Sequence, residues 1–206
     1  MNKTLEVYHN ADVVTRFGLD PNVTGNVSYR NKLRMMSAKK VRGKNILDVG
    51  CGNGLLLEKL NGKLVGVDFS GSMLEEASKR QPNCTYVVAS ATHLPFKDKS
   101  FDTAVCIDML HHLPTDSAQL SAIKELIRVS SKRAVFEIKT HDWLSPIRNF
   151  FSSILKYKHK TAESPLAGMQ YHNASLKKIK KLLSSYKYKI QRVSFFVDWR
   201  LVTVRC

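Results

Sequence analysis

The chain contains 206 residues, of which 43% are apolar and 24% are charged. These proportions exclude an intrinsically disordered tail, a collagen-like fibre and a disulfide-rich scaffold. Lysine and arginine outnumber aspartate and glutamate by 33 to 17, which gives a net charge of +16. Residues 1–60 carry 10 bases and 5 acids, residues 61–140 carry 10 and 9, and residues 141–206 carry 13 and 3. A polyanionic partner therefore has to be considered mainly for the last third of the chain.

The four cysteines are Cys51, Cys84, Cys106 and Cys206, and no two of them form a C-x-x-C pair. This spacing favours neither a disulfide framework nor a structural zinc site, so we expect no bound metal and a reducing compartment. Residues 1–10 are polar and lack the apolar core of a signal peptide. No apolar stretch approaches the ~18 residues needed to cross a membrane. We expect a soluble, cytoplasmic protein without a transmembrane segment.

Short β-branched or apolar runs alternate along the chain with segments of helical periodicity. This alternation predicts a parallel sheet covered by helices on both faces. The expected strands span residues 45–49, 63–68, 84–89, 101–107, 134–138, 189–196 and 199–205. Because the last two runs follow the last predicted helix, we expect the sheet to end in a strand pair.

Helix starts and apolar helix faces can also be predicted between these strands. A helix over 55–60 follows the first strand. Ser72 and Glu75, three residues apart, predict a capping box after the second strand, in which each side chain accepts the backbone N–H of the other residue. Residues 114–116 open a further helix before the fifth strand. The apolar faces of the two later helices comprise Leu120, Ile123, Leu126 and Ile127, and then Leu176, Ile179, Leu182 and Leu183.

The most informative stretch is 46–54, which reads Ile-Leu-Asp-Val-Gly-Cys-Gly-Asn-Gly. Glycines where a buried strand turns into a helix let the backbone approach a ligand closely and adopt positive φ. The spacing G-x-G-x-G differs from the dinucleotide fingerprint G-x-G-x-x-G, which disfavours a dehydrogenase. Asp68 ends the next strand, 18 residues after Gly50. An acid at that place can accept hydrogen bonds from both hydroxyls of a ribose.

At these residues the chain resembles the class I S-adenosylmethionine-dependent methyltransferases, in particular the group that includes the ubiquinone and menaquinone C-methyltransferases. The resemblance covers residues 44–139, with motifs at 46–54, 65–68, 94–96, 100–102, 108–113 and 125–129. It implies S-adenosylmethionine as the cofactor and an α/β, Rossmann-like fold. The sheet would have seven mostly parallel strands, helices on both faces and an antiparallel C-terminal strand. Residues 130–133 replace the family's usual Lys-Pro-Gly-Gly turn, which should alter that turn but not the cofactor site.

The resemblance also implies roles for individual residues. The end of the first strand and the glycine loop would surround the methionine part of the cofactor, Asp68 would bind the ribose, and Phe69 and Met73 would lie near the adenine. Where the family often has an acid for the adenine amino group, this chain has Ser90 followed by Ala91, so Ser90 or backbone groups would make that contact. The expected cofactor-binding residues are Asp48, Gly50, Cys51, Gly52, Asn53, Gly54, Asp68, Phe69, Ser70, Met73, Ser90, Ala91 and Cys106.

The reaction implied by this cofactor depends mainly on positioning, because a sulfonium methyl group is already activated. A general base is optional. The catalytic candidates are His111 and His112, just beyond the fourth strand, with Tyr171 and His172 further along. Imidazole is equally useful for packing and for capping a loop, so each histidine also has a purely structural interpretation. We assign no covalent nucleophile.

We expect a single methyltransferase domain over residues 1–206. Residues 1–44 would form an N-terminal cover, 45–140 the cofactor-binding core, 141–172 an insertion or lid, and 173–206 the C-terminal helix and strand pair. Long segments between regular elements are commonly lids or binding loops.

The preferred acceptor is a small molecule, either quinone-like or otherwise apolar or anionic, which the insertion would cover. Phe150, Phe151, Ile154 and Leu155 give a helix in the insertion one apolar face, which basic residues flank. Such a face could also lie on an anionic membrane surface, as a peripheral contact, or pack on the domain.

RNA is the alternative acceptor. Residues 101–129 are similar to the tRNA wobble-uridine methyltransferases, although residues 117–119 lack the arginine pair that those enzymes carry. The predicted last helix bears Lys177, Lys178, Lys180 and Lys181 opposite its apolar face. Tyrosines and lysines alternate over 186–189, which suits single-stranded RNA, although a solvated lysine face explains the same pattern. A second alternative is a cofactor-binding partner protein without catalysis, which the complete glycine loop and Asp68 disfavour.

Overall fold

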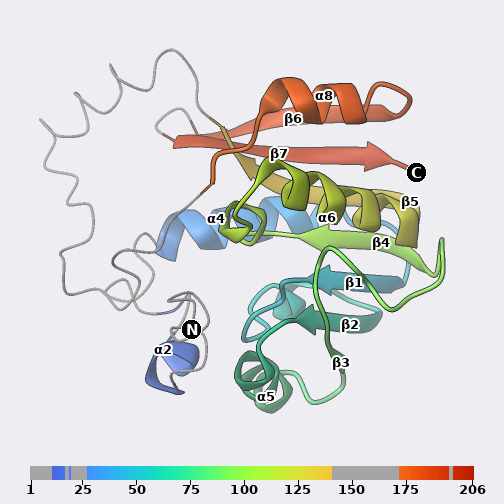
Figure 1. The fold of residues 1–206 in the computed structure, drawn as a ribbon. Coiled ribbons are helices and arrows are strands. Elements are labelled where there is room, and N and C mark those ends of the chain that lie inside the picture. Colours follow the sequence, from blue (N-terminus) through green and yellow to red (C-terminus); the bar gives the residue numbers. More distant parts are fainter. Residues whose placement is uncertain (1–10, 17–18, 20–26, 141–171, 195–196) are drawn as a thin grey trace, which may run out of the picture.

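The computed structural model describes residues 11–16, 19, 27–140, 172–194 and 197–206 (Figure 1). These residues form one seven-stranded sheet in the order β3-β2-β1-β4-β5-β7-β6. The strands are β1 (Asn45–Val49), β2 (Lys63–Asp68), β3 (Thr85–Val88), β4 (Phe101–Cys106), β5 (Ser130–Lys139), β6 (Lys187–Ser194) and β7 (Val197–Arg205).

The first five strands pair in parallel, and β7 runs antiparallel to both of its neighbours, β5 and β6. The expected α/β fold with one antiparallel C-terminal strand is therefore confirmed. Because β1 pairs with both β2 and β4, the strand order reverses at β1. The carboxyl end of β1 is thus the topological switch point, where open α/β sheets bind their ligands.

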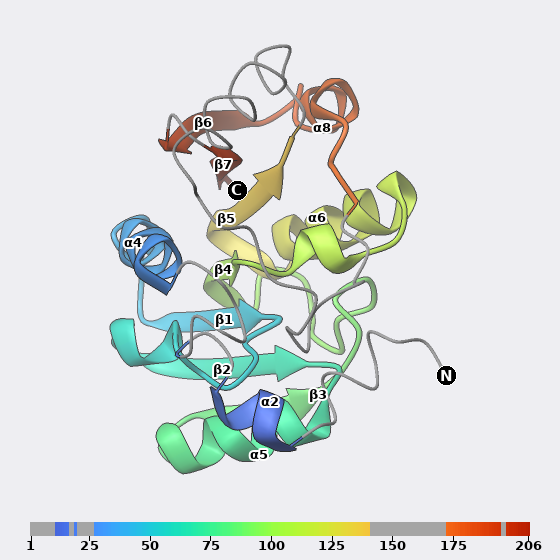
Figure 2. The same cartoon turned by 90° about the vertical axis from the view of Figure 1, so that its left-hand side faces the viewer.

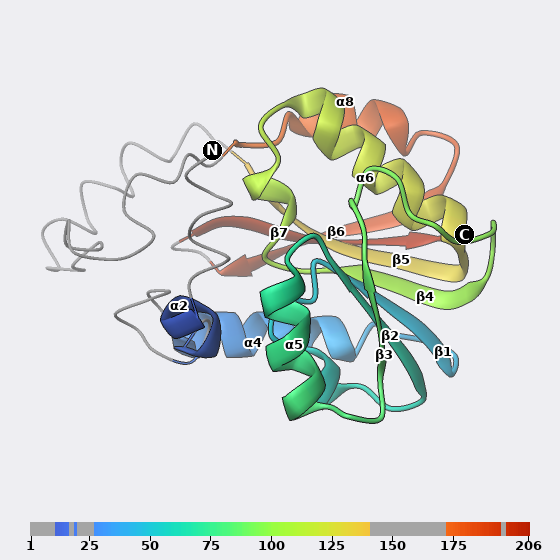
Figure 3. The same cartoon turned by 60° about the horizontal axis from the view of Figure 1, so that its bottom comes forward.

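Helices cover both faces of the sheet. Figure 2 shows α4 (Val27–Ala38) on one side and α6 (Asp116–Val129) and α8 (Leu176–Leu182) on the other. Figure 3 shows α6 and α8 next to each other along the second half of the sheet. One core cluster joins the α6 and α8 side to the sheet, and a second contains Leu33 of α4 and Leu74 of α5 (Gly71–Arg80). The short α2 (Ala11–Arg16) contacts α5.

The helix predicted over 55–60 is wrong, because only the 3-10 helix η1 (Leu57–Lys59) forms there. Leu55, Leu56, Leu57 and Leu60 are all buried. A regular α-helix buries one stripe of its surface, so three consecutive leucines cannot all point into the core from the same helix face. The tighter, irregular turn buries all of them.

The capping box predicted at Ser72 and Glu75 is also wrong, because Ser70 caps α5. The side chain of Ser70 accepts a hydrogen bond from the N–H of Met73 (3.3 Å), and its own N–H donates to Asp68 (3.0 Å). Asp68 therefore fixes the start of this helix. The start predicted for α6 is confirmed, since Thr115 is its N-cap and accepts from the N–H of Ala118 (3.1 Å).

The second half of the sheet also differs from the prediction in its boundaries. Residues 130–133 form no turn, because α6 leads directly into β5 at Ser130. Strand β6 begins two residues earlier than predicted, at Lys187, and ends at Ser194. The predicted insertion lies outside the described residues except for His172. No helix of the described residues is long and apolar enough to cross a membrane.

Candidate active site

The glycine loop folds over the carboxyl end of β2. The backbone N–H groups of Gly50 and Cys51 both donate to the carbonyl oxygen of Val67, at 2.7 and 3.0 Å. Gly50 has φ +73°, and a Cβ atom there would lie 2.4 Å from Cγ of Met109. Gly52 has φ +52°, and a Cβ atom there would meet nothing within 4 Å. The loop thus needs glycine at position 50 for packing and at position 52 for backbone conformation, and it leaves open space beside Gly52.

Asp68 connects this loop to the start of α5. One carboxylate oxygen accepts from the N–H of Gly52 (2.9 Å) and the other from the N–H of Ser70 (3.0 Å). The side chain is 8% exposed. Burial raises the pKa of Asp68, while these backbone hydrogen bonds act in the opposite direction. The backbone of Phe69 also hydrogen-bonds to this carboxylate. Since an ionised carboxylate offers about four acceptor positions, Asp68 retains capacity for a further hydroxyl donor.

Asp48 is the second buried acid of the site. It is 2% exposed, and its Oδ2 atom has no hydrogen-bond partner among the described residues. Burial, and after it the nearby charge of Asp68, raise the pKa of Asp48 to about 7, although the charge of Arg34 acts in the opposite direction. A buried carboxylate in this position is stabilised by a cationic group brought next to it.

Two arginines of α4 face the same space as Asp48. Arg30 and Arg34, one helical turn apart, line the pocket together with Asp48, Gly50 and Gly52. Burial lowers the pKa of Arg34 to about 10, and the charge of Arg30 contributes to this lowering. The pocket therefore offers an unpartnered carboxylate oxygen and two guanidinium groups, a combination that suits a zwitterion.

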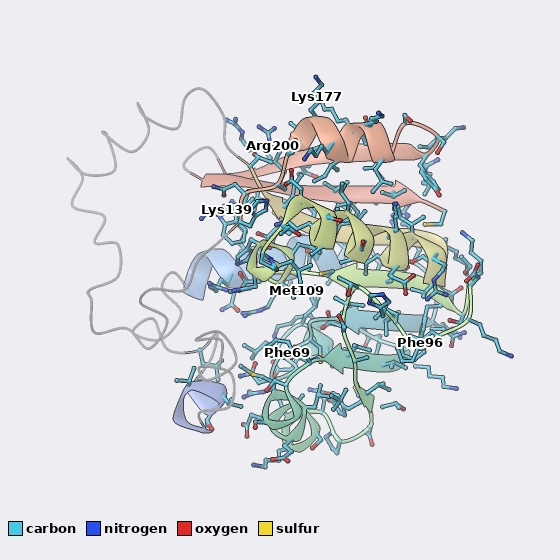
Figure 4. The ribbon with its side chains drawn as sticks, in the orientation of Figure 1. Phe69, Phe96, Met109, Lys139, Lys177 and Arg200 are labelled. Atoms are coloured by element: carbon cyan, nitrogen blue, oxygen red, sulfur yellow. The ribbon has the colours of Figure 1, made fainter. Side chains whose placement is uncertain are left out.

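A second pocket continues from the glycine loop along the ends of β2, β3 and β4. Its lining comprises Gly50, Gly52, Val67, Asp68, Phe69, Met73, Ala89, Ser90, Ala91, Asp108, Met109, His112 and Leu113. Figure 4 shows Phe69 and Met109 on the side of the sheet where these strands end. Phe69 is 42% exposed, so much of its ring is available to a flat apolar ligand.

Asp108 separates the two pockets and lines both of them. It follows β4 with φ +61°, and its N–H donates to Oε2 of Glu137 at 2.9 Å. Its carboxylate forms an ion pair with Arg30. Glu137 is 2% exposed, and burial raises its pKa well above the usual range. Contacts with Glu137 of β5 and Arg30 of α4 thus stabilise the left-handed backbone conformation at Asp108.

The three described histidine candidates lie in different surroundings. His111 is 3% exposed, packs edge-on against Trp199 with ring centroids 4.7 Å apart, and lies outside the pocket lining. Burial, and after it the charges of neighbouring cations, lower its pKa well below the usual value. His112 lines the second pocket. His172 interacts with Asp116 at the start of α6 (2.9 Å). Of these three candidates, His112 is therefore the one that lines either of the two pockets.

Most of the expected cofactor residues line these two pockets, and three line neither of them. Gly54 packs against Ala77 of α5, Ser70 caps α5, and Cys106 is buried. Burial raises the pKa of both Cys51 and Cys106 well above the usual thiol value, which disfavours a reactive thiolate at either position. Tyr171 lies outside the described residues.

Sequence reasoning missed Arg30, Arg34, Asp108 and Glu137. Two of them carried a signal, since Glu137 is an acid inside an apolar strand and Asp108 follows a buried strand directly. The two arginines carried no such signal, because the local sequence does not indicate which face of the sheet α4 covers.

The strand order, the glycine loop at the switch point and the two buried acids define a class I S-adenosylmethionine-dependent methyltransferase. A model of the methyltransferase domain family matches residues 47–138. The human protein "Probable tRNA methyltransferase 9B" is 36% identical over 100 residues, which cover 48% of this chain and 21% of that protein. The 2-phytyl-1,4-naphtoquinone methyltransferase of a Nostoc species is 33% identical over 107 residues, which cover 46% of this chain and 47% of that protein. The chain thus matches half or less of the length of these relatives.

The similarity to solved structures extends over the whole chain. The magnesium protoporphyrin IX methyltransferase of Synechocystis, solved with bound SAH, has a TM-score of 0.70 and 16% identity. The match covers 98% of this chain and 97% of that one. At this identity the similarity establishes the fold alone.

Proposed function

We propose that this protein transfers the methyl group of S-adenosylmethionine to an acceptor presented next to Met109 and His112. The observation that carries this proposal is the pair of connected pockets around the glycine loop. An orphaned carboxylate oxygen on Asp48 and the open space beside Gly52 match a ligand with an ammonium group and close backbone contact.

The residues present fit this cofactor in three parts. Asp48 would accept from the ammonium group, and Arg30 and Arg34 would bind the carboxylate of the same methionine part. Asp68 would accept from the ribose hydroxyls through its remaining acceptor capacity. Phe69 and Met73 would contact the adenine, with Ser90 at its polar edge. The cofactor supplies an activated methyl group, so the protein's contribution is to position the acceptor and exclude water.

Asp108 lines both pockets and His112 lines the second, and both would face the acceptor. Asp108, fixed by Glu137 and Arg30, orients this wall of the site. His112 would accept a proton from the acceptor where the attacking atom carries one. Because His111 is buried and its pKa is lowered, it would act as a neutral packing partner of this wall.

Of the two acceptor classes that the sequence leaves open, we propose RNA. The supporting observation is the placement of the basic residues at the start of β6, since Lys187 and Lys189 are exposed rather than buried. The 34% to 36% identity to mammalian proteins named as tRNA methyltransferases supports the same acceptor. A small apolar acceptor is the second candidate, favoured by the apolar lining from Phe69, Met109 and Leu113 and by the quinone-related relative.

One experiment tests both the activity and the acceptor class. The full chain is incubated with radiolabelled S-adenosylmethionine and, separately, with total tRNA or with a small-molecule extract. We expect label in tRNA. Label in the extract alone would exclude RNA in favour of the second candidate, and absence of cofactor binding would contradict the methyltransferase function itself.

A further inference from the structure

Three cationic residues stand directly opposite one another across the last three strands of the sheet. Arg205 of β7 pairs in register with Arg133 of β5 on one side and with Lys187 of β6 on the other. Directly paired residues of antiparallel strands point to the same face of the sheet. Arg133, Arg205 and Lys187 therefore form one line of positive charge, the cation row, with steps of about 5 Å from strand to strand.

The cation row has no acidic partner in the part of the chain that the structure describes. None of its members forms an ion pair there, whereas Lys132, next to Arg133, pairs with Asp102 at 2.8 Å. Arg205 and Lys187 are exposed. Lys189, two residues along β6, is exposed on the same face as Lys187. Burial lowers the pKa of Arg133, and the charges of Arg42 and Arg205 lower it further, which reports their mutual repulsion.

Such an arrangement opposes folding. Like charges placed directly opposite each other on neighbouring strands are destabilising, and alternation of charges would remove the cost. An exposed edge strand such as β6 is protected from aggregation by a single lysine, so protection does not account for three cations in line. The arrangement is favourable when a polyanion lies across the strands.

The position of the cation row determines how large that polyanion has to be. Arg133 precedes the carboxyl end of β5, Lys139, by six residues, or about 20 Å at the usual rise of a strand. Figure 1 shows the C-terminus, directly after Arg205, at the end of the sheet opposite the carboxyl ends of β1 and β4. A metabolite in the pocket beside Met109 cannot reach this row. A nucleic acid can place one nucleotide in the pocket and its backbone on the row.

We propose that the cation row and Lys189 bind the phosphate backbone of the RNA acceptor, at a distance from the methyl-transfer site. This inference rests on the proposed function and adds where the acceptor is held. It assigns substrate binding to the face of the β5-β7-β6 sheet on the α4 side, rather than to the lysines of α8, which lie on the opposite side.

The test compares two variants that lose the same charge from the two faces. The row variant is Arg133→Gln with Lys187→Gln and Arg205→Gln, and the matched control is Lys177→Gln with Lys180→Gln and Lys181→Gln. Lys178 is left unchanged because it pairs with Asp116. Affinity for fluorescein-labelled total tRNA is measured by anisotropy at several salt concentrations, and cofactor affinity is measured on each variant.

We expect the row variant to bind tRNA about tenfold or more weakly than the control variant, with cofactor affinity unchanged in both. The slope of log affinity against log salt should become shallower by about 2, since each lost phosphate contact contributes about 0.7 for single strands. Equal loss in both variants, or no loss in the row variant, would overturn the proposal. Loss of binding to phosphatidylserine vesicles with unchanged tRNA binding would overturn it too, in favour of a membrane surface.

A second variant keeps the test valid if the first is unstable. Arg133 donates a hydrogen bond to the carbonyl oxygen of Lys40 (2.9 Å), so its replacement could disturb the fold. Lys187→Gln with Lys189→Gln removes only exposed side chains of the edge strand, and Lys177→Gln with Lys180→Gln is its control. The proposed function is tested separately, by methyl transfer from the cofactor in the wild-type chain. Failure of the proposed function would appear as absence of methyl transfer. Failure of this inference would appear as equal tRNA affinity of the two variants, so the two failures are distinguishable.

Discussion

The two ends of the sheet carry charged residues of opposite sign in different surroundings. At the carboxyl ends of β1, β2 and β5, the acids Asp48, Asp68 and Glu137 are between 2% and 8% exposed. At the other end, the three members of the cation row stand in line across three strands, with Lys187 and Arg205 exposed and Arg133 half-buried. Both arrangements cost the ligand-free protein stability, the first through desolvation and the second through repulsion. Under the two proposals above, these ends of one sheet would bind ligands of opposite charge.

The largest expected effect is at Asp68. Asp68→Ala should weaken binding of S-adenosylmethionine by about 10- to 100-fold, because a charged hydrogen-bond acceptor for the ribose is lost. Isothermal titration calorimetry measures this change. Glu75→Ala, which removes an exposed acid of α5, is the control and should bind as the wild type does. Equal affinities of Asp68→Ala and the control would remove Asp68 from the cofactor site.

Substitutions of the two loop glycines, Gly50 and Gly52, should affect stability and cofactor affinity to different extents. Gly50→Ala adds a Cβ atom 2.4 Å from Cγ of Met109, so it should lower both the melting temperature and cofactor affinity. Gly52→Ala carries only the left-handed strain of about 1–2 kcal/mol, and its Cβ atom enters the open space beside the loop. It should reduce affinity about tenfold with the smaller loss of melting temperature. Thermal unfolding with and without cofactor measures both, and equal affinity losses accompanied by equal melting shifts would contradict this distinction.

The raised pKa of Asp48 predicts a pH dependence. The folded protein holds this proton more tightly than the unfolded chain, so ionisation of Asp48 destabilises the ligand-free fold as pH rises towards about 7. The cofactor's ammonium group favours the ionised form, so cofactor affinity should increase severalfold between pH 5.5 and 7.5. Asp48→Asn should bind more weakly and lose most of this dependence. A wild-type affinity that is flat over the same range would exclude contact between Asp48 and the ammonium group.

The smallest expected effect concerns stability at the other end of the sheet. Lys187→Glu places an acid opposite Arg205 and replaces a like-charge pair by an opposite-charge pair. It should raise the free energy of unfolding by about 0.2–1 kcal/mol while it weakens tRNA binding. Urea unfolding measures the first quantity. Lys177→Glu on α8 is the control, and a stability gain of the same size there would attribute the effect to net charge.

The arrangement of the glycine loop and Asp68 was largely predictable because these residues are close together along the chain. The glycine loop and Asp68 occur at characteristic distances from strand ends, and these distances determine where they meet in a parallel sheet. The irregular helix at η1 was not predictable from periodicity, since burial of three consecutive leucines overrides the helical pattern. Likewise, the choice of Ser70 over Ser72 as the cap depends on its contact with Asp68.

The cation row was not predictable because it depends on strand register. Arg133, Lys187 and Arg205 come from three separate segments, and a slip of one residue in either pairing would direct one of them to the other face. The basic excess of the last third was visible in the sequence, and it pointed to the consecutive lysines of α8. The fold assigns a second set of cations, which includes Arg133 from the nearly neutral middle of the chain, to one surface.

The central claim is that one end of the sheet carries the methyl-transfer site and the other binds the RNA backbone. Steady-state methyl transfer from S-adenosylmethionine into total tRNA tests this claim most directly. We predict that the row variant raises KM for tRNA about tenfold and leaves kcat and KM for the cofactor unchanged, because Arg133 of the cation row lies about 20 Å along β5 from the carboxyl end of that strand. A row variant with the wild-type KM for tRNA would contradict the account.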